Sequence, residues 1–398
     1  MTLEVRALGV ACDLKCRYCY QNAHRAAGQT GGGYDLDAIK RAIEDHGDGF
    51  HLFGGEPLLM PERDLEELWR WGFERFGRNA LQTNGARLHA GHVELIRRYQ
   101  VAVGVSIDGP GELNDARWAG SLDKTRRATA RSEAAIQMLC DAGVPPGLML
   151  QLTRANCAPD RLPRLHDWLR RLDAMGVSAG RLHVLEIDSP ALRRELGMTV
   201  DENIAVLSGL FDLEAELTRL RFDLSQEMPE MLLGRDRSAA CVWRACDPYT
   251  TEAVHGCDGH GAKHNCGLTD KEGINFQKPD APGYERYLAL YHTPQDHGGC
   301  QGCRFFVVCK GQCPGTAIDN DWRNRTEYCG VWKRLFARFE DRLVARGQTP
   351  ITRSPELAEW ERRLVDGWQR GHNLQLEIDL LPQLGAQPDA DPESQPWR

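Results

Sequence analysis

The chain has 398 residues, 41% of them apolar, which is enough to bury the cores of one large and one smaller domain. Its 49 basic and 57 acidic side chains give a formal charge of −8, which excludes a chain-wide positive field for nucleic acid or anionic lipid. No apolar run approaches the roughly 18 residues of a membrane span, and the N-terminus lacks the features of a secretory signal. We therefore expect a cytoplasmic protein that uses neither a membrane nor nucleic acid.

Short apolar runs alternate with stretches of helical period up to residue 186, a pattern typical of parallel strands joined by helices. Six such units are too few for a complete eight-stranded barrel, so residues 1–222 are predicted to form a partial (β/α)6 TIM-like barrel of the α/β class. The strands are expected at 3–10, 49–53, 79–82, 101–107, 147–152 and 181–185, with helices at 36–46, 65–76, 125–142 and 162–175.

A polar or glycine-rich loop follows each of the first four predicted strands. Ligands gather at the carboxyl ends of parallel strands, so these loops are expected to face one common site. In chain order they are Cys12 to Cys19, Gly54-Gly55-Glu56-Pro57, Thr83-Asn84-Gly85 and Asp108-Gly109-Pro110.

The rest of the chain changes character. A helix is expected at 202–221, and residues 223–240 are predicted to be a linker. Residues 241–348 are rich in Cys, Gly and His and weakly periodic until a helix at 331–346, which indicates a small domain organised by metal. Residues 349–398 are predicted to form a helix, with Ser354 as N-cap and proline at its first position, and a disordered tail from 385.

Fourteen cysteines in a cytoplasmic protein favour metal or cluster ligation over disulfides. Three of them, Cys12, Cys16 and Cys19, lie on one loop and could hold three corners of a 4Fe-4S cluster, which leaves the fourth iron open to a ligand. Zinc is the alternative, with His24 as a nearby fourth ligand. Three cysteines stand outside any motif and are expected to be core or surface thiols: Cys140, Cys157 and Cys257.

The spacing of this triplet, with Tyr18 as the aromatic residue before the last cysteine, resembles the signature of the radical S-adenosylmethionine (SAM) superfamily. The resemblance covers roughly residues 2–220. It implies that the backbone and carboxylate of the Gly54, Gly55, Glu56 and Pro57 segment receive the methionyl ammonium of SAM. A plain turn is the alternative for that segment.

The same resemblance assigns three further positions. Ser106 and Arg117 are implied to contact the SAM carboxylate, and the segment with Gln82 and Asn84 to line the substrate side of the cavity. A strand-to-helix turn is the alternative for that last segment, because Asn-Gly is a common turn pair.

The second cysteine field, from Cys241 to Cys329, resembles the SPASM extension of the same superfamily, which carries two auxiliary 4Fe-4S clusters. A pair of zinc knuckles that use His255, His260 and His264 is the alternative. The predicted cofactors are thus three 4Fe-4S clusters and SAM. Family connectivity implies one cluster on Cys241, Cys246, Cys266 and Cys313, and the other on Cys300, Cys303, Cys309 and Cys329.

The resemblance implies an enzyme in which a 5′-deoxyadenosyl radical abstracts hydrogen from a peptide or protein. We favour an oxidoreductase that modifies or crosslinks a residue of a ribosomally made precursor peptide, with Asp258 and His260 as candidate bases. The alternatives are a formylglycine-forming sulfatase maturase and a SPASM dehydrogenase of a small alcohol. A noncatalytic Fe-S electron carrier is a different class. Sulfatase maturases have an aspartate after a SPASM cysteine, where this chain has Gly267.

The expected partners are the peptide substrate and an electron donor such as flavodoxin or ferredoxin. The sequence starts at the first predicted strand, so a leader peptide is expected to need another surface or a separate leader-binding protein.

Overall fold

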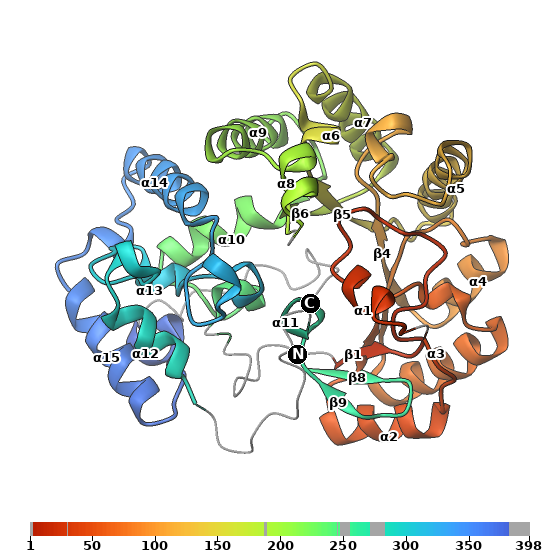
Figure 1. Ribbon diagram of the computed structural model, residues 1–398, viewed down its shortest axis with the longest axis horizontal. Coiled ribbons are helices and arrows are strands. Elements are labelled where there is room, and N and C mark those ends of the chain that lie inside the picture. The colour runs from red at the N-terminus through yellow and green to blue at the C-terminus, as the bar shows by residue number, and fades with distance from the viewer. Residues whose placement is uncertain are drawn as a thin grey trace. The chain divides into compact units, whose positions relative to one another are not determined.

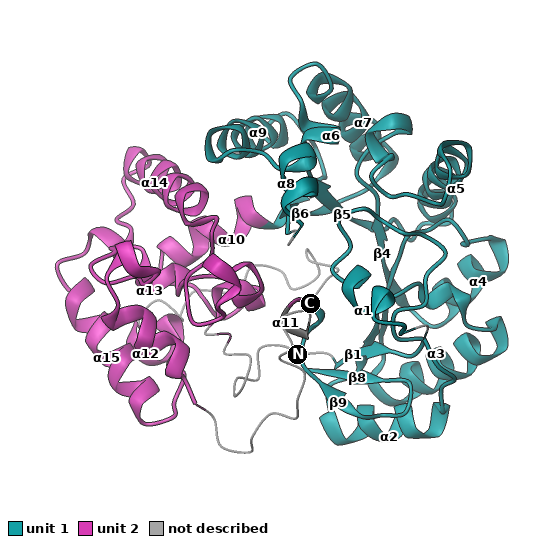
Figure 2. Cartoon of the chain, in the orientation of Figure 1, with its two compact units in different colours: residues 1–223, 255–267, 393–398 teal, residues 224–254, 268–392 magenta. Residues whose placement is uncertain are grey.

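The computed structural model describes residues 3–29, 31–186, 189–244, 246, 255–270 and 283–381. They fall into two compact units, drawn in different colours in Figure 2. Among the described residues, the first unit runs to residue 223 and takes in 255–267, and the second comprises the rest.

The first unit is built on one nine-stranded sheet in the order β7-β6-β5-β4-β3-β2-β1-β8-β9. Every neighbouring pair is parallel except β8 and β9, which form an antiparallel hairpin. The six predicted strands are all present, so the partial barrel is confirmed. The strands are β1 Leu3–Arg6, β2 Phe50–Leu52, β3 Asn79–Thr83, β4 Val101–Ser106, β5 Gly147–Leu152, β6 Ala179–Val184, β7 Arg221–Phe222, β8 Gly256–Asp258 and β9 Lys263–His264.

Helices connect these strands and lie along the outer side of the sheet (Figure 1). The predicted helices at 36–46 and 162–175 have those bounds, because each ends at a glycine with positive φ, Gly47 or Gly176. The helices of this unit are α1 Asn22–Ala26, α2 Leu36–His46, α3 Glu62–Phe76, α4 Ala90–Arg98, α5 Leu122–Asp141, α6 Arg154–Cys157, α7 Leu162–Met175, α8 Pro190–Leu196 and α9 Val200–Glu214.

The inner side of the barrel is polar. Along β5 and β6 the buried leucines alternate with half-buried residues such as Gln151, Arg181 and His183. The positive charge of Arg181 acts both on His183 in its own strand and on His51 in β2, so the curved sheet turns these side chains toward one interior. Burial lowers the pKa of His51 to about 4 and that of His183 to about 3, so both imidazoles are neutral at pH 7.

Three segments belong to a different element or unit than the sequence predicted. Part of the predicted linker at 223–240 is helix α10, Asp223–Leu232, because apolar residues at helical spacing, such as Leu224, Met228 and Met231, are buried there. The predicted helix at 202–221 ends at Glu214, and β7 follows. Residues 255–267, assigned by sequence to the cysteine-rich domain, belong to the first unit, because β8 pairs in parallel with the free edge of β1.

The second unit is helical and has an aromatic core. Trp243 packs edge to face against Trp332 and Phe336, and Tyr287 lies against Trp368. Besides α10, its helices are α11 Gly267–Asp270, whose first residue belongs to the first unit, α12 Glu285–His292, α13 Phe306–Cys309, α14 Cys329–Ala345 and α15 Leu357–Gln369.

The end of the chain departs slightly from the prediction. Helix α15 starts two residues later than expected, because residues 354–356 form a turn in which the Ser354 hydroxyl accepts the Glu356 amide at 3.3 Å. The predicted disordered tail from 385 lies outside the described residues. Among the residues that are described, no helix combines the length and apolar character needed to cross a membrane.

Candidate active site

The loop with the first three cysteines follows β1 and is held by backbone hydrogen bonds. The Lys15 amide donates to the Trp118 carbonyl at 2.6 Å, and the Arg17 amide donates to the Ala116 carbonyl at 2.8 Å. These bonds join the cysteine loop to the segment beyond β4. The loop therefore has a fixed position at the carboxyl edge of the sheet, although it contains no helix or strand of its own.

Two sulfur atoms of this loop accept hydrogen bonds from the protein. The Leu14 amide lies 3.4 Å from Cys12 Sγ, and Arg25 Nη1 lies 3.5 Å from Cys19 Sγ. Burial raises the pKa of Cys12 to about 11 and that of Cys16 to about 12, so a bound metal has to displace these protons. All fourteen cysteines lie in the described part of the chain, and none of them forms a disulfide bond. A three-cysteine loop with amide and guanidinium donors fits an anionic Fe-S cluster.

Arg25 was not identified from the sequence. Its Nε donates to the Val10 carbonyl at 3.0 Å, and its Nη1 also donates to Asn22 Oδ1 at 2.8 Å. These bonds fix the guanidinium beside Cys19. The available signal was a basic residue on a short helix directly after the last cysteine, a pattern shared by many surface arginines.

The Gly54-Gly55-Glu56-Pro57 segment packs directly against the cysteine loop. Gly55 has φ +56°, and a Cβ at this position would lie 2.1 Å from the Ala11 carbonyl oxygen, so only glycine fits. The Glu56 amide donates to that same carbonyl at 2.8 Å, and the Gly55 amide donates to Gln21 Oε1 at 3.1 Å. Pro57 is buried at the start of a short 3-10 helix.

The Glu56 carboxylate joins two strand-end loops. It is only 1% exposed and accepts hydrogen bonds from Thr83 Oγ1 at 2.6 Å, the Asn84 amide at 2.8 Å and the Leu58 amide at 3.1 Å. Burial raises its pKa to about 7. A carboxylate has about four acceptor positions, and donors among the described residues use three of those of Glu56. No described residue donates a hydrogen bond to the backbone carbonyl of Gly54 or Gly55, so these oxygens are also open to an ammonium group.

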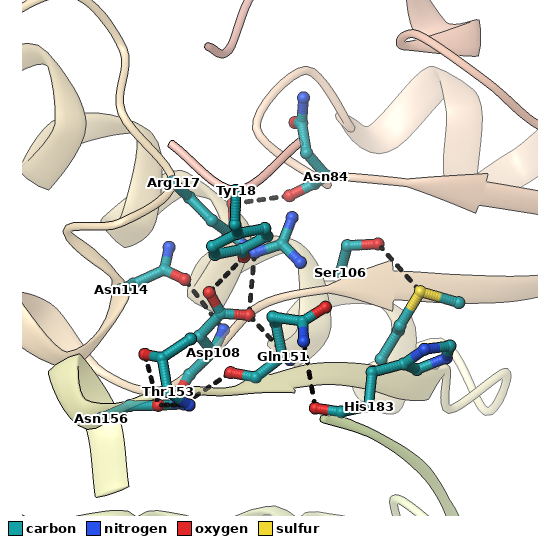
Figure 3. A network of polar contacts seen from close by, with 12 residues as sticks. Tyr18, Asn84, Ser106, Asp108, Asn114, Arg117, Gln151, Thr153, Asn156 and His183 are labelled. Carbon is teal, nitrogen blue, oxygen red and sulfur yellow. Dashed lines mark hydrogen bonds and ion pairs between the residues drawn. The ribbon is translucent and has the colours of Figure 1, made fainter. Parts of the chain in front are cut away.

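Asp108 organises the residues around Arg117, as Figure 3 shows. Asp108 Oδ1 accepts hydrogen bonds from Arg117 Nε at 3.1 Å and from the backbone amide of Gln151 at 3.1 Å. The Tyr18 hydroxyl donates to Asp108 Oδ2. The Arg117 guanidinium lies over the Tyr18 ring, 5.7 Å from its centroid. Burial alone would lower the pKa of Arg117, but the Asp108 charge raises it above its usual value.

Arg117 therefore stays charged in a buried position. Among the described residues, its two Nη atoms have no hydrogen-bond acceptor, so this end of the guanidinium is available to a carboxylate. The sequence prediction that Arg117 binds the SAM carboxylate fits this arrangement.

Gln82 and Ser106 lie side by side on β3 and β4. Gln82 Nε2 donates to Ser106 Oγ at 2.7 Å, while Gln82 Oε1 is buried and accepts no hydrogen bond from any described residue. A buried amide oxygen without a partner indicates a ligand position. Asn84 differs, because its side chain donates to Asp13 at 2.8 Å and accepts the Ala86 amide at 2.8 Å. It braces its own turn, and a contact with substrate stays a prediction.

The two candidate bases belong to the β8–β9 hairpin. Asp258 Oδ1 accepts the His260 amide at 2.8 Å and the Ala262 amide at 2.9 Å, so its carboxylate stabilises the turn, and His260 is exposed. These bonds account for Asp258 without catalysis, and a catalytic role for either residue stays a prediction.

The position after Cys266 is filled by an aromatic ring. A Cβ on Gly267 would lie 2.3 Å from Tyr20 Cε2 and 2.6 Å from the Tyr20 hydroxyl oxygen. A carboxylate side chain at residue 267 would therefore require Tyr20 to move. The sequence reveals the missing aspartate but not the tyrosine that occupies its space.

Four cysteines of the second unit line one cavity, and the auxiliary cluster that the resemblance implies for them stays a prediction. These are Cys300, Cys303, Cys309 and Cys329, and the cavity wall also includes Phe305, Phe336, Arg325 and Lys333.

The other four predicted auxiliary ligands are divided between the units. Cys241, Cys246 and Cys313 belong to the second unit and Cys266 to the first, so their common cluster stays a prediction. Between Cys309 and Cys313 the chain turns through three residues with positive φ, of 50°, 74° and 59°.

Residues 7–153 match the model of the radical SAM superfamily. A serine-type anaerobic sulfatase-maturating enzyme of Klebsiella aerogenes is 25% identical over 355 residues, 84% of each chain. The enzyme of the same description from Bacteroides thetaiotaomicron is 29% identical over 28% of this chain and 30% of its own length. An uncharacterized protein of Methanocaldococcus jannaschii is 27% identical over 42% of this chain and 57% of its own length.

Solved structures share the fold over most of the chain. The native anSMEcpe structure with bound AdoMet and the Kp18Cys peptide has a TM-score of 0.64, with 17% identity over 87% of this chain and 98% of that one. Streptococcus suis SuiB bound to the precursor peptide SuiA has a TM-score of 0.53, with 15% identity over 83% and 76%.

Residues 7–153 thus carry a radical SAM domain, and the three-cysteine loop lies within it. The described fold is shared with the anSMEcpe and SuiB structures.

Proposed function

We propose that this chain is a peptide maturase that oxidatively modifies or crosslinks a residue of a ribosomally made precursor peptide. The observation that carries the proposal is the convergence of the cysteine loop, the Arg117 guanidinium and the orphaned Gln82 oxygen at one edge of a polar barrel interior. The fold is also that of two structures whose names record a bound peptide.

The proposal includes three 4Fe-4S clusters and SAM. Cys12, Cys16 and Cys19 would hold the first cluster, and the eight SPASM-type cysteines the auxiliary two. When bound, the first cluster and SAM together supply one-electron cleavage of the sulfonium and hydrogen abstraction from a substrate carbon.

The residues of this chain bind and orient SAM and the peptide. Arg117, fixed by Asp108, would hold the carboxylate of SAM, and Glu56 with the carbonyls of Gly54 and Gly55 would hold its ammonium. The neutral imidazoles of His51 and His183 keep the barrel interior free of two further positive charges. The polar interior would receive the peptide side chain and exclude bulk water.

The experiment is anaerobic reconstitution with iron and sulfide, followed by incubation with SAM and dithionite. Formation of 5′-deoxyadenosine is expected, and its absence would favour the noncatalytic Fe-S carrier. Synthetic peptides encoded by the short reading frames beside the gene are then added. Loss of two hydrogens from one of them, measured by mass spectrometry, is the expected result. Oxidation of a small alcohol with no peptide modified would favour the dehydrogenase alternative.

Formylglycine formation is a second candidate, because the Klebsiella aerogenes relative aligns over 84% of the chain. Against it stands the Tyr20 ring in the space where a side chain at residue 267 would begin. A peptide with a sulfatase-type Cys or Ser motif is the test. We expect no aldehyde, as measured by hydrazide labelling. An aldehyde formed at a rate similar to that of SAM cleavage would make this the function.

The proposed location is the cytoplasm, where thiols stay reduced. An electron-donor protein and a separate leader-binding protein are the proposed partners besides the peptide.

A further inference from the structure

A pocket on the surface of the first unit adjoins the cysteine loop. Four of the residues that line it are basic, one is acidic, and its apolar wall comes from the cysteine loop, the turn before α5 and α5 itself. We call it the cationic pocket. It is lined by Arg87, Lys124, Arg127, Arg131, Asp13, Leu14, Ala119 and Ala128.

The charge of the cationic pocket forms a stripe along one helix. Lys124, Arg127 and Arg131 are exposed and lie at positions i, i+3 and i+7 of α5, so they follow one helix face over about 10 Å. Arg127 pairs with Asp123 at 2.5 Å, whereas Lys124 and Arg131 form no ion pair among the described residues. The stripe is therefore a local region of positive charge in a chain whose formal charge is −8.

The apolar wall of the pocket is also the packing layer of the cysteine loop. Leu14 and Ala128 are buried in one apolar cluster, and Cys12, Cys16 and Ala119 pack against that cluster. Leu14 also donates its amide to Cys12 Sγ at 3.4 Å. A single layer of side chains therefore separates the cationic pocket from the thiols that would hold the first cluster.

We propose that the cationic pocket is the docking site of an acidic one-electron carrier protein, a flavodoxin or ferredoxin, that reduces the first cluster. The inference rests on the proposed function, because only a redox cluster at Cys12, Cys16 and Cys19 needs an electron at this place. The donor loses one electron and the cluster gains one, while no atom is transferred. Docking here brings the two redox centres close enough for transfer through Leu14 and the Cys12 thiolate.

The length of the cationic stripe favours a protein as its partner over a small anion. One phosphate cannot span a cationic stripe of about 10 Å, whereas the acidic surface of a carrier protein can pair with all of it. The stripe lies on the outer helix layer, on α5, and not among the polar residues of the barrel interior where the substrate is proposed to react.

The test uses Lys124→Glu/Arg131→Glu in the reconstituted holoenzyme, with Arg41→Glu/Arg97→Glu as the matched control. The control residues are exposed arginines of α2 and α4 without an ion pair among the described residues, and the change in charge is the same. The dissociation constant of oxidised flavodoxin is measured by titration calorimetry at low salt. The rate of 5′-deoxyadenosine formation is measured with reduced flavodoxin and, separately, with dithionite.

The expected result for the pocket variant is about tenfold weaker flavodoxin binding and at least a tenfold slower flavodoxin-driven reaction. The dithionite-driven reaction should stay within twofold of wild type, and rising salt should weaken wild-type binding more than variant binding. Unchanged flavodoxin binding would overturn the proposal, as would equal losses in the control variant. If the dithionite-driven modification of peptide falls instead, the pocket serves the substrate and the donor assignment is wrong. The dithionite arm tests the proposed function separately from the donor site.

Discussion

The two cysteine sites of this protein differ in how far along the chain their ligands are spread. Cys12, Cys16 and Cys19 lie on one loop that is fixed by a few backbone hydrogen bonds to residues 116–118. The four cysteines around the cavity of the second unit extend from residue 300 to residue 329 and come from different helices and turns.

The second site consequently depends on packing. Phe305 stacks on Phe336 at 5.6 Å, and the fully buried Arg286 donates to the carbonyls of Trp322 and Asn324 at 2.7 and 3.0 Å. These contacts bring together segments that carry different cysteines. A loop site of the first kind tolerates changes elsewhere in the fold, whereas a site of the second kind is sensitive to them. The first two predictions below test this difference, and the other two test the residues around the first site that are proposed to bind SAM.

The largest effect is expected in the first site. Replacing Cys12, Cys16 and Cys19 together by Ala should abolish SAM cleavage and remove about a third of the iron, because one of three proposed clusters is lost. Iron analysis and 5′-deoxyadenosine assays measure this. Cys140→Ala, at a half-buried thiol outside the motifs, is the control and should keep both SAM cleavage and the full iron content. Retained SAM cleavage in the triple variant would contradict the site assignment.

A change in the second site should separate two activities. Cys303→Ser or Cys309→Ser should lower peptide modification strongly while SAM cleavage without peptide modification persists, because these thiols belong to the second unit. Loss of thiolate ligands also weakens the fold around them, so thermal unfolding is recorded for each variant. Full peptide modification in a folded, iron-depleted variant would show that the second site is not needed.

Asp108→Asn should weaken SAM binding at least tenfold, because Arg117 would lose the charge that fixes it. The side chains of Arg117 and Asp108 are 10% and 1% exposed, and removing one member of a buried ion pair lowers the free energy of unfolding by about 3 to 5 kcal/mol. Asp115→Asn is the control, because its partner Arg126 is 41% exposed, and should lower the free energy of unfolding by less than about 1 kcal/mol. The affinity for SAM and the free energy of unfolding are measured for both variants, and similar losses of SAM affinity in the two would argue against a special role for Asp108.

Glu56 should give SAM binding a moderate pH dependence. Burial raises the pKa of Glu56 from 4.5 to about 7, so its contribution to folding stability is present below pH 4.5 and lost as the pH rises toward 7. Binding of an ammonium group should instead strengthen as the pH rises, because it needs the ionised carboxylate of Glu56. SAM affinity should therefore rise several-fold between pH 6 and 8, and Glu56→Gln should lack this part of the change. If the SAM affinity of the wild type and that of Glu56→Gln change in parallel with pH, Glu56 does not bind the ammonium group.

Local patterns in the sequence determined much of the first unit. The apolar alternation and the glycines after helices place the six strands and the helices around them, because these elements depend on period and on glycine conformation near their ends. The resemblance carried by the cysteine triplet, Gly54-Gly55-Glu56-Pro57 and Arg117 also identified residues that the structure brings to one edge of the sheet.

The tertiary structure decided what depends on contacts between distant residues. Arg25 beside Cys19, Asp108 beneath Arg117 and Tyr20 in the space next to Gly267 have no period or spacing by which a sequence could reveal them. The hairpin at 256–264 was assigned to the wrong unit, because pairing with the edge of β1 is a property of the folded sheet. The cationic stripe on α5 is readable as i, i+3 and i+7, but only packing reveals that Leu14 and Ala128 place it one layer from the cysteines.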